Sequence, residues 1–81
     1  MKFFFSSRAL DDYDHLPPRL QKLFEKQLEF LLHNLRYPSL RAKKYDETTD
    51  RWQARVNDEY RFYFQIEKDV YVIVAIIKHP K

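Results

Sequence analysis

The sequence predicts an α+β fold, in which an N-terminal strand and a two-helix hairpin pack on one face of a mainly antiparallel twisted sheet. Two observations predict this class. Apolar residues of the first half recur at three- and four-residue spacing, which indicates helices, whereas those after residue 39 recur at every second position, which indicates strands. The chain has 81 residues, of which 44% are hydrophobic, enough for one modest core. We therefore expect a single domain over residues 1–81.

The first part of the chain predicts a strand and a short helix. Residues 2–5 form an aromatic run closed by Ser6 and Ser7. We interpret this run as a strand that is buried on both faces. Either serine can cap the helix that follows, because a serine hydroxyl accepts a hydrogen bond from a free N–H of the first turn. This helix is expected to place three residues on one face, namely Ala9, Leu10 and Tyr13.

The second helix has the strongest local pattern. Pro17 and Pro18 can occupy its first turn, where a missing N–H costs nothing. The segment Tyr37-Pro38-Ser39 breaks it. Between these limits the apolar residues form a stripe that we assign to the core. The stripe consists of Leu20, Leu23, Phe24, Leu28, Leu31 and Leu35.

The second half predicts a meander of three or four strands. Its strand segments are residues 40–45, 52–56, 60–66 and 70–77, and the turns between them are residues 46–50, 57–59 and 67–69. The first segment is a weak, basic candidate. In the second and third segments apolar and polar residues alternate, so each has one apolar and one polar face. The last segment is apolar throughout, as expected of a central strand.

The composition excludes several kinds of chemistry. The chain has no cysteine, which removes disulfides, thiolate zinc sites and cysteine nucleophiles. It also has no glycine, which removes glycine-rich phosphate loops and dinucleotide fingerprints. His15 and His33 have no partners at the spacing of metal ligands. We therefore expect neither a metal nor a cofactor.

Charge and hydropathy indicate a soluble, cytoplasmic protein. The N-terminus fails as a signal peptide, because its apolar run is three residues long and Asp11 and Asp12 follow soon after. No segment approaches the length of a membrane span. The formal net charge of +3 is mild, and it favours a polyanionic partner without deciding its kind.

The candidate functional site lies on the polar face of the meander. If Arg55 and Arg61 flank one hairpin turn, alternation brings them close together with Tyr63 beside them. Guanidinium groups bind phosphate bidentately and keep their charge, and an aromatic ring can stack on an unpaired base. His79 follows the last strand, and an imidazole there could act as general acid or base in cleavage by a 2′-hydroxyl.

The neighbouring strand could extend this basic surface through Lys43, Lys44 and Arg51. Each of these residues also has a plainer interpretation. Arginine and tyrosine are common on half-exposed sheet faces, and lysines often protect the edge of a sheet. His79 lies beside a chain end, where fraying is common.

Three motifs occur in a specific order along the meander. They are Leu40-Arg41-Ala42-Lys43-Lys44-Tyr45, then Trp52-Gln53-Ala54-Arg55-Val56, then Tyr60-Arg61-Phe62-Tyr63-Phe64-Gln65-Ile66. This series, together with the helical hairpin before it, resembles the RelE/ParE superfamily of type II toxins over nearly the whole chain. The resemblance implies a toxin that is neutralised by a cognate antitoxin.

The resemblance also implies an activity and site residues. RelE-like members cut mRNA in the ribosomal A site without a metal. Arg61 matches the arginine that binds the scissile phosphate in these enzymes, Arg55 matches a basic position on the preceding strand, and His79 is the candidate for proton transfer. Gln53 stands where some members have a second basic residue. These matches favour a ribosome-dependent endoribonuclease that contacts RNA through Lys43, Lys44, Arg51, Gln53 and Tyr63.

Two alternatives remain open. RelE-like members usually continue past the last strand with further basic residues and a Tyr or His, whereas this sequence ends at His79-Pro80-Lys81. That difference favours a ParE-like toxin that inhibits DNA gyrase without catalysis, or a degenerate toxin that only binds its antitoxin.

Overall fold

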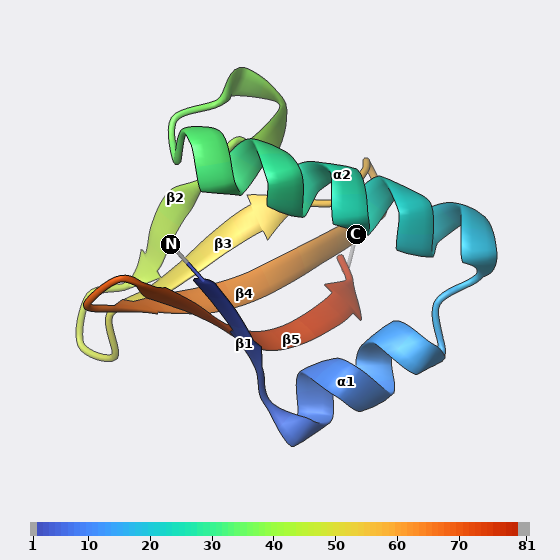
Figure 1. Cartoon of the computed structure of the whole chain (residues 1–81), viewed down its shortest axis with the longest axis horizontal. Helices are drawn as coiled ribbons and strands as arrows, with labels where there is room; N and C mark the ends of the chain where they lie inside the picture. Colours follow the sequence, from blue (N-terminus) through green and yellow to red (C-terminus); the bar gives the residue numbers. More distant parts are fainter. Residues whose placement is uncertain (1, 80–81) are drawn as a thin grey trace.

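The computed structural model describes residues 2–79 and has the predicted α+β architecture (Figure 1). Met1, Pro80 and Lys81, which belong to the expected domain of residues 1–81, lie outside the described residues. The elements in chain order are β1 (Lys2–Phe5), α1 (Ser7–Asp14), α2 (Pro18–His33), the 3₁₀ helix η1 (Pro38–Leu40), β2 (Lys43–Asp46), β3 (Arg51–Arg55), β4 (Tyr60–Glu67) and β5 (Val70–Lys78).

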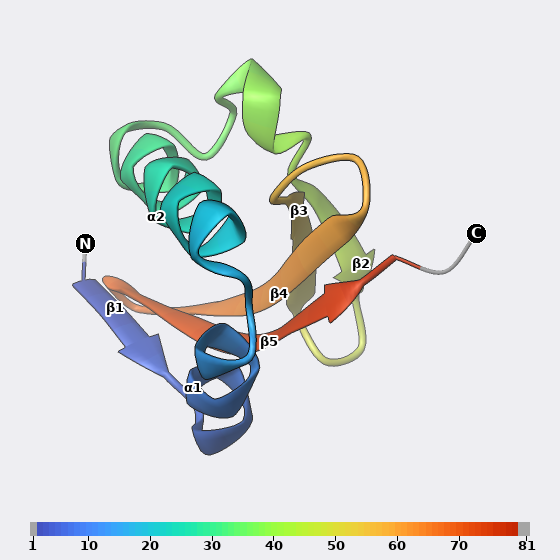
Figure 2. The ribbon, with the colours of Figure 1, turned by 90° about the vertical axis from the view of Figure 1, so that its right-hand side faces the viewer.

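The strands form one five-stranded sheet in the order β1-β5-β4-β3-β2. Strands β2 to β5 are an antiparallel meander, and β1 adds to β5 in parallel. The last strand, β5, is therefore an interior strand, as predicted. In Figures 1 and 2, α2 crosses the sheet, and α1 lies beside β5 and β1. Neither α-helix is long and apolar enough to cross a membrane.

Local sequence signals set where the helices begin. The Oγ of Ser6 accepts a hydrogen bond from the N–H of Ala9 and donates one to the carbonyl of Val74, so the N-cap of α1 is also tied to β5. Pro18 is the first residue of α2, where its fixed backbone angle suits a helix and no N–H is needed.

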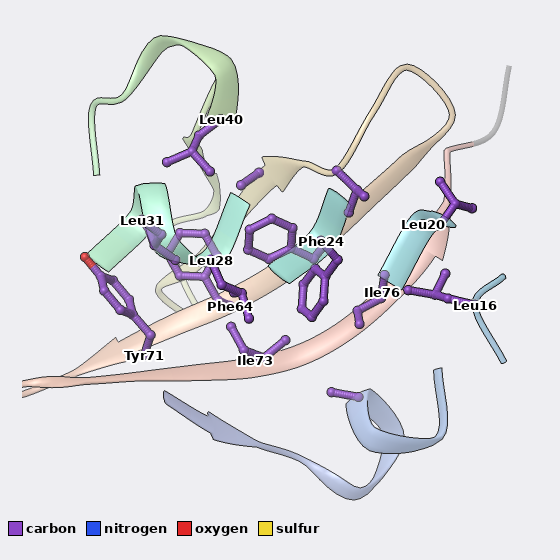
Figure 3. Packing of buried hydrophobic residues seen from close by; sticks show 14 residues of the cluster. Leu16, Leu20, Phe24, Leu28, Leu31, Leu40, Phe64, Tyr71, Ile73 and Ile76 are labelled. Atoms are coloured by element: carbon purple, nitrogen blue, oxygen red, sulfur yellow. The ribbon is translucent and has the colours of Figure 1, made fainter. Parts of the chain in front are cut away.

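The core lies between α2 and the sheet (Figure 3). Phe24 of α2 and Phe62 and Phe64 of β4 are fully buried. The rings of Phe24 and Phe62 meet edge to face, with their centroids 5.2 Å apart. Such a pair adds about 0.5–1.5 kcal/mol beyond the burial of its apolar surface. The meander is thereby held to α2 by the apolar face of β4.

Three predictions of burial are wrong. Phe3 and Phe5 pack against the core, so Phe4, which lies between them on the edge strand β1, points to the other face and is 62% exposed; β1 is therefore not buried on both faces. Leu10 is also exposed, because only Ala9 and Tyr13, four residues apart, point from α1 toward the core. Leu23 lies half-exposed at the margin of the stripe on α2.

Two predicted boundaries differ by more than one residue, and the other strand ends differ by at most one. The weak strand begins at Lys43 rather than at residue 40, because Leu40 is fully buried within η1. The helix α2 ends at His33, so Leu35 packs against the core from the following loop and not from the helix.

The absence of glycine leaves left-handed backbone positions to other residues. Among the described residues these positions are Arg41, Asp50 and Lys68, with φ between 46° and 56°. This conformation costs a residue with a Cβ atom about 1–2 kcal/mol. Glycine adopts it freely but loses more entropy on folding.

We expect Lys68→Gly to raise the free energy of unfolding by about 0.5–1 kcal/mol, since Lys68 lies in the exposed β4–β5 turn with φ at 56°. Urea denaturation followed by circular dichroism measures the change. Asp69→Gly, at the next position and without a positive φ, is the matched control and should lower stability. An equal effect of both substitutions would contradict the explanation from backbone strain.

Candidate functional site

The β3–β4 hairpin sets the position of two arginines. Arg55 pairs directly with Arg61 in the antiparallel register, and the adjacent pair, Ala54 and Phe62, is buried in the core. Because side chains alternate along a strand, Arg55 and Arg61 project from the opposite face of the sheet. We call the face of β2, β3 and β4 that points away from α2 the open face.

Four cations converge on this face. A hollow of about 260 Å³ is lined by Arg41, Lys43, Gln53, Arg55, Arg61 and His79. We call it the basic hollow. The lining side chains include four cations, one imidazole and one amide, but no carboxylate. Like charges crowded in a small volume repel one another, so an anion that enters the hollow relieves this repulsion as it binds.

Arg61 is held by the turn between β3 and β4. Its Nη1 donates to the carbonyl oxygens of Asn57 and Tyr60. The Oδ1 of Asn57 in turn accepts the N–H groups of Glu59 and Tyr60 and shapes the turn. Both of these hydrogen bonds are donated by Nη1. The guanidinium is therefore oriented by bonds in which Nη2 and Nε take no part.

Arg55 is held less firmly at its charged end. Its Nη1 lies 3.0 Å from Oδ1 of Asp58, but the side chain of Asp58 is 93% exposed, so water screens this ion pair strongly. The Nε of Arg55 is buried and has no hydrogen-bond partner in the structure. Because water screens the pair with Asp58, a phosphate oxygen could replace Asp58 at Nη1 at little cost.

The backbone of Arg55 is fixed by Gln27 of α2. The Nε2 of Gln27 donates to the carbonyl oxygens of Arg55 and Ser39, at 2.6 and 3.1 Å, and its Oε1 accepts from the hydroxyl of Ser39. The side chain of Gln27 is buried, although it is polar. The sequence patterns did not predict a role for this residue. The available signal was a polar residue on the apolar stripe of α2, three residues after Phe24.

His79 is fastened to the same turn as Arg61. Its N–H donates to the carbonyl of Glu59 at 2.6 Å, which anchors the residue that follows β5 beside the start of β4. On the other side of the basic hollow, Lys43 pairs with Gln53 across β2 and β3. Arg41 also lines the hollow, although it was not among the predicted site residues.

Tyr63 lies on the open face next to the basic hollow, because it pairs with Gln53. Burial raises the pKa of its hydroxyl, and the nearby Tyr45 raises it further, while Arg61 acts in the opposite direction. The phenol therefore stays neutral at physiological pH and does not repel an anion in the hollow.

The structure does not bring Lys44 and Arg51 to the hollow. Lys44 pairs with Trp52, whose ring packs against the core, so it does not share the face of Lys43. Its Nζ lies 2.9 Å from Oδ1 of Asp50, and this hydrogen bond raises the pKa of Lys44. Arg51 pairs with Gln65, at the end of β3 that lies away from Arg55. Within residues 2–79, no three His, Asp or Glu side chains are grouped as metal ligands would be.

The fold and the open basic face define the class of the protein. An N-terminal strand, two helices and a four-stranded meander form the fold of the RelE/ParE toxins. A family model described as the ParE toxin of the type II toxin-antitoxin system parDE matches residues 3–81, so the chain belongs to this family of toxins. Among curated proteins, no sequence matches the chain.

Solved structures share this fold at low sequence identity. The YoeB/ParE toxin from Agrobacterium tumefaciens is similar with a TM-score of 0.84 and 14% identity, over 99% of this chain and 100% of that chain. The YoeB dimer from Staphylococcus aureus gives a TM-score of 0.82 and 19% identity, over 100% and 98%. The isolated E. coli RelE toxin gives 0.76 and 20%, over 98% and 84%.

We expect Gln27→Leu to lower the free energy of unfolding by about 1–3 kcal/mol, because the carbonyls of Arg55 and Ser39 lose their donor while leucine fills a similar volume. Urea denaturation measures the loss. The matched control is Lys22→Leu at an exposed position of the same helix, which should change stability by less than about 0.5 kcal/mol. If Gln27→Leu were as stable as the wild type, the proposed role of this hydrogen-bond network would be wrong.

Proposed function

We propose that this toxin is a ribosome-dependent endoribonuclease that cleaves mRNA, with the scissile phosphate bound in the basic hollow. The observation that carries the proposal is the convergence of Arg41, Lys43, Arg55 and Arg61 with His79 around one hollow without a carboxylate. The motifs of the meander, which resemble those of RelE-like members, support mRNA in the ribosomal A site as the substrate. Such an activity belongs in the cytoplasm.

In the proposed reaction, which takes place on the ribosome, the protein contributes three side chains. The 2′-hydroxyl of the RNA loses its proton and attacks the adjacent phosphorus, and the bond from phosphorus to the 5′-oxygen of the next nucleotide breaks. The products are a 2′,3′-cyclic phosphate and a 5′-hydroxyl. The pentacovalent intermediate carries more negative charge than the substrate, so fixed guanidinium groups stabilise it preferentially. Arg61 and Arg55 take this role. His79 acts either as the general base that accepts the proton of the 2′-hydroxyl or as the general acid that protonates the leaving 5′-oxygen, and water serves the other proton transfer.

A cognate antitoxin is the proposed protein partner. Similar toxins have been solved with antitoxins, as in the YoeB-YefM complex from Staphylococcus aureus and the intact E. coli RelBE toxin-antitoxin complex. We infer that an antitoxin neutralises this chain in the same way.

The second candidate function is inhibition of DNA gyrase without catalysis. It is favoured by the family model, whose description is that of the ParE toxin. Under this function the basic hollow would serve binding alone, and His79 would have no part in proton transfer. A degenerate toxin that only binds its antitoxin is the remaining alternative.

Pulse labelling after induction of the chain in a bacterial host without antitoxin tests the proposal. We expect incorporation of methionine to collapse before incorporation of thymidine, because mRNA cleavage stops translation first. Arg61→Ala should reduce cleavage by about 100-fold or more, as does the loss of one fixed group that stabilises transition-state charge. Lys44→Ala, which removes a cation outside the hollow, is the matched control and should remain toxic.

Because Arg61 also holds the turn, Arg61→Ala removes a structural contact as well as a charge. Arg61→Lys and His79→Gln are therefore tested beside it. Arg61→Lys keeps the charge but loses the bidentate fork, so it should retain partial activity. Early loss of thymidine incorporation would instead identify gyrase as the target, and normal incorporation of both precursors would leave antitoxin binding as the function.

A further inference from the structure

A pair of tyrosines forms an aromatic corner beside the basic hollow. The rings of Tyr45 on β2 and Tyr63 on β4 have their centroids 5.2 Å apart and are inclined by 67°. The side chain of Tyr45 is 59% exposed, although it is large and mostly apolar. Two rings inclined in this way offer two apolar walls, against which a third flat group can stack on one ring and touch the edge of the other.

An irregularity in β2 accompanies this contact. Lys44 pairs with Trp52 and Asp46 pairs with Arg51, so the register shifts around Tyr45, which has no partner of its own on β3. Strands β2 and β4 are not neighbours, and their backbones lie about 9.5 Å apart with β3 between them. The side chain of Tyr45 therefore reaches across β3 to touch Tyr63. Bulges redirect side chains in this way and are common next to active sites.

We propose that Tyr45 and Tyr63 form a stacking site for one unpaired RNA base, next to the nucleotide whose phosphate occupies the basic hollow. This inference rests on the proposed function. It adds to that function a binding subsite and a requirement for single-stranded substrate.

The spacing along the strands supports this arrangement. Tyr63 lies two residues from Arg61 on β4, and Tyr45 lies two residues from Lys43 on β2. Two residues of a strand span about 6.6 Å, similar to the length of one nucleotide. A phosphate held by Arg61 and Lys43 therefore has the base of an adjacent nucleotide within reach of both rings.

The chemistry of the corner selects an unpaired base. Aromatic rings bind the flat face of a base, and in an RNA helix these faces are covered by neighbouring bases. Every base has such a face, so the site tolerates different sequences, and the larger faces of purines gain most. Because Tyr63 stays neutral, for the reasons given above, it does not repel the phosphates on either side.

Binding of short single-stranded RNA to the full chain tests the stacking site without the ribosome. The RNA carries a fluorescent label and a 2′-O-methyl group at every nucleotide, so that it is not cleaved, and fluorescence anisotropy gives the dissociation constant at low salt. We expect Tyr45→Ala to weaken binding between about 5- and 150-fold, the range known for one stacked base. Tyr45→Phe should bind like the wild type. Lys44→Ala is the neighbouring control, with its side chain outside the hollow.

A second RNA with abasic positions separates stacking from a structural role of Tyr45. Wild type should bind the abasic RNA more weakly, and Tyr45→Ala should bring no further loss with it. If Tyr45→Ala weakened binding of both RNAs equally, or if duplex RNA bound as well as single strands, the stacking site would be overturned while RNA binding remained. If wild type bound neither RNA, the stacking site would be overturned, whereas the proposed function, which depends on the ribosome, would still be decided by the pulse-labelling experiment.

Discussion

The register of the β3–β4 hairpin is the constraint on which the rest of the structure depends. It pairs Ala54 with Phe62 on the buried face and Arg55 with Arg61 on the open face. A slip of one residue would exchange the two faces of a strand. The rings of Phe62 and Phe64 would then lose burial worth about 1.5–3 kcal/mol each, and a guanidinium would be forced beneath α2. The free energy that builds the core therefore also holds the arginines on the solvent side, so the site needs no separate scaffold.

The parts of the site are joined at one end of the sheet. Gln27 fixes the carbonyl of Arg55 from the helix side, Asn57 shapes the turn that holds Arg61, and the carbonyl of Glu59 anchors His79. All of these contacts involve residues 55–59 or their immediate neighbours. The turn between β3 and β4 is thus the point where the core, the two arginines and His79 meet. A disturbance of this turn is expected to affect all three together, whereas the turns at Asp50 and Lys68 can change without moving the basic hollow.

Much of this arrangement follows from the sequence, because alternation and helical spacing are local properties. They predict the stripe of α2, a meander of three or four strands and the shared face of Arg55 and Arg61. They do not predict the order of strands in the sheet, and so the exposure of Phe4 at the edge was missed. Gln27 was missed because its partners are carbonyls 12 and 28 residues away. The positions of Lys44 and Tyr45 depend on the irregularity in β2, for which the sequence carries no recognised signal.

Backbone strain at Arg41 bears on whether the hollow was shaped for binding. Its φ of 46° is a conformation in which glycine would be more stable, yet the residue there is a cation that lines the hollow. Strain alone does not argue for function, since Asp50 and Lys68 carry the same strain in turns outside the hollow. Arg41 differs from these two because it also lines the basic hollow, where four positive charges, its own included, lie close together. Both the backbone strain and the repulsion among these charges destabilise the free protein, and a bound anion relieves the repulsion. This combination is typical of a site whose stability depends on its ligand, and it favours a polyanion as the natural occupant of the basic hollow.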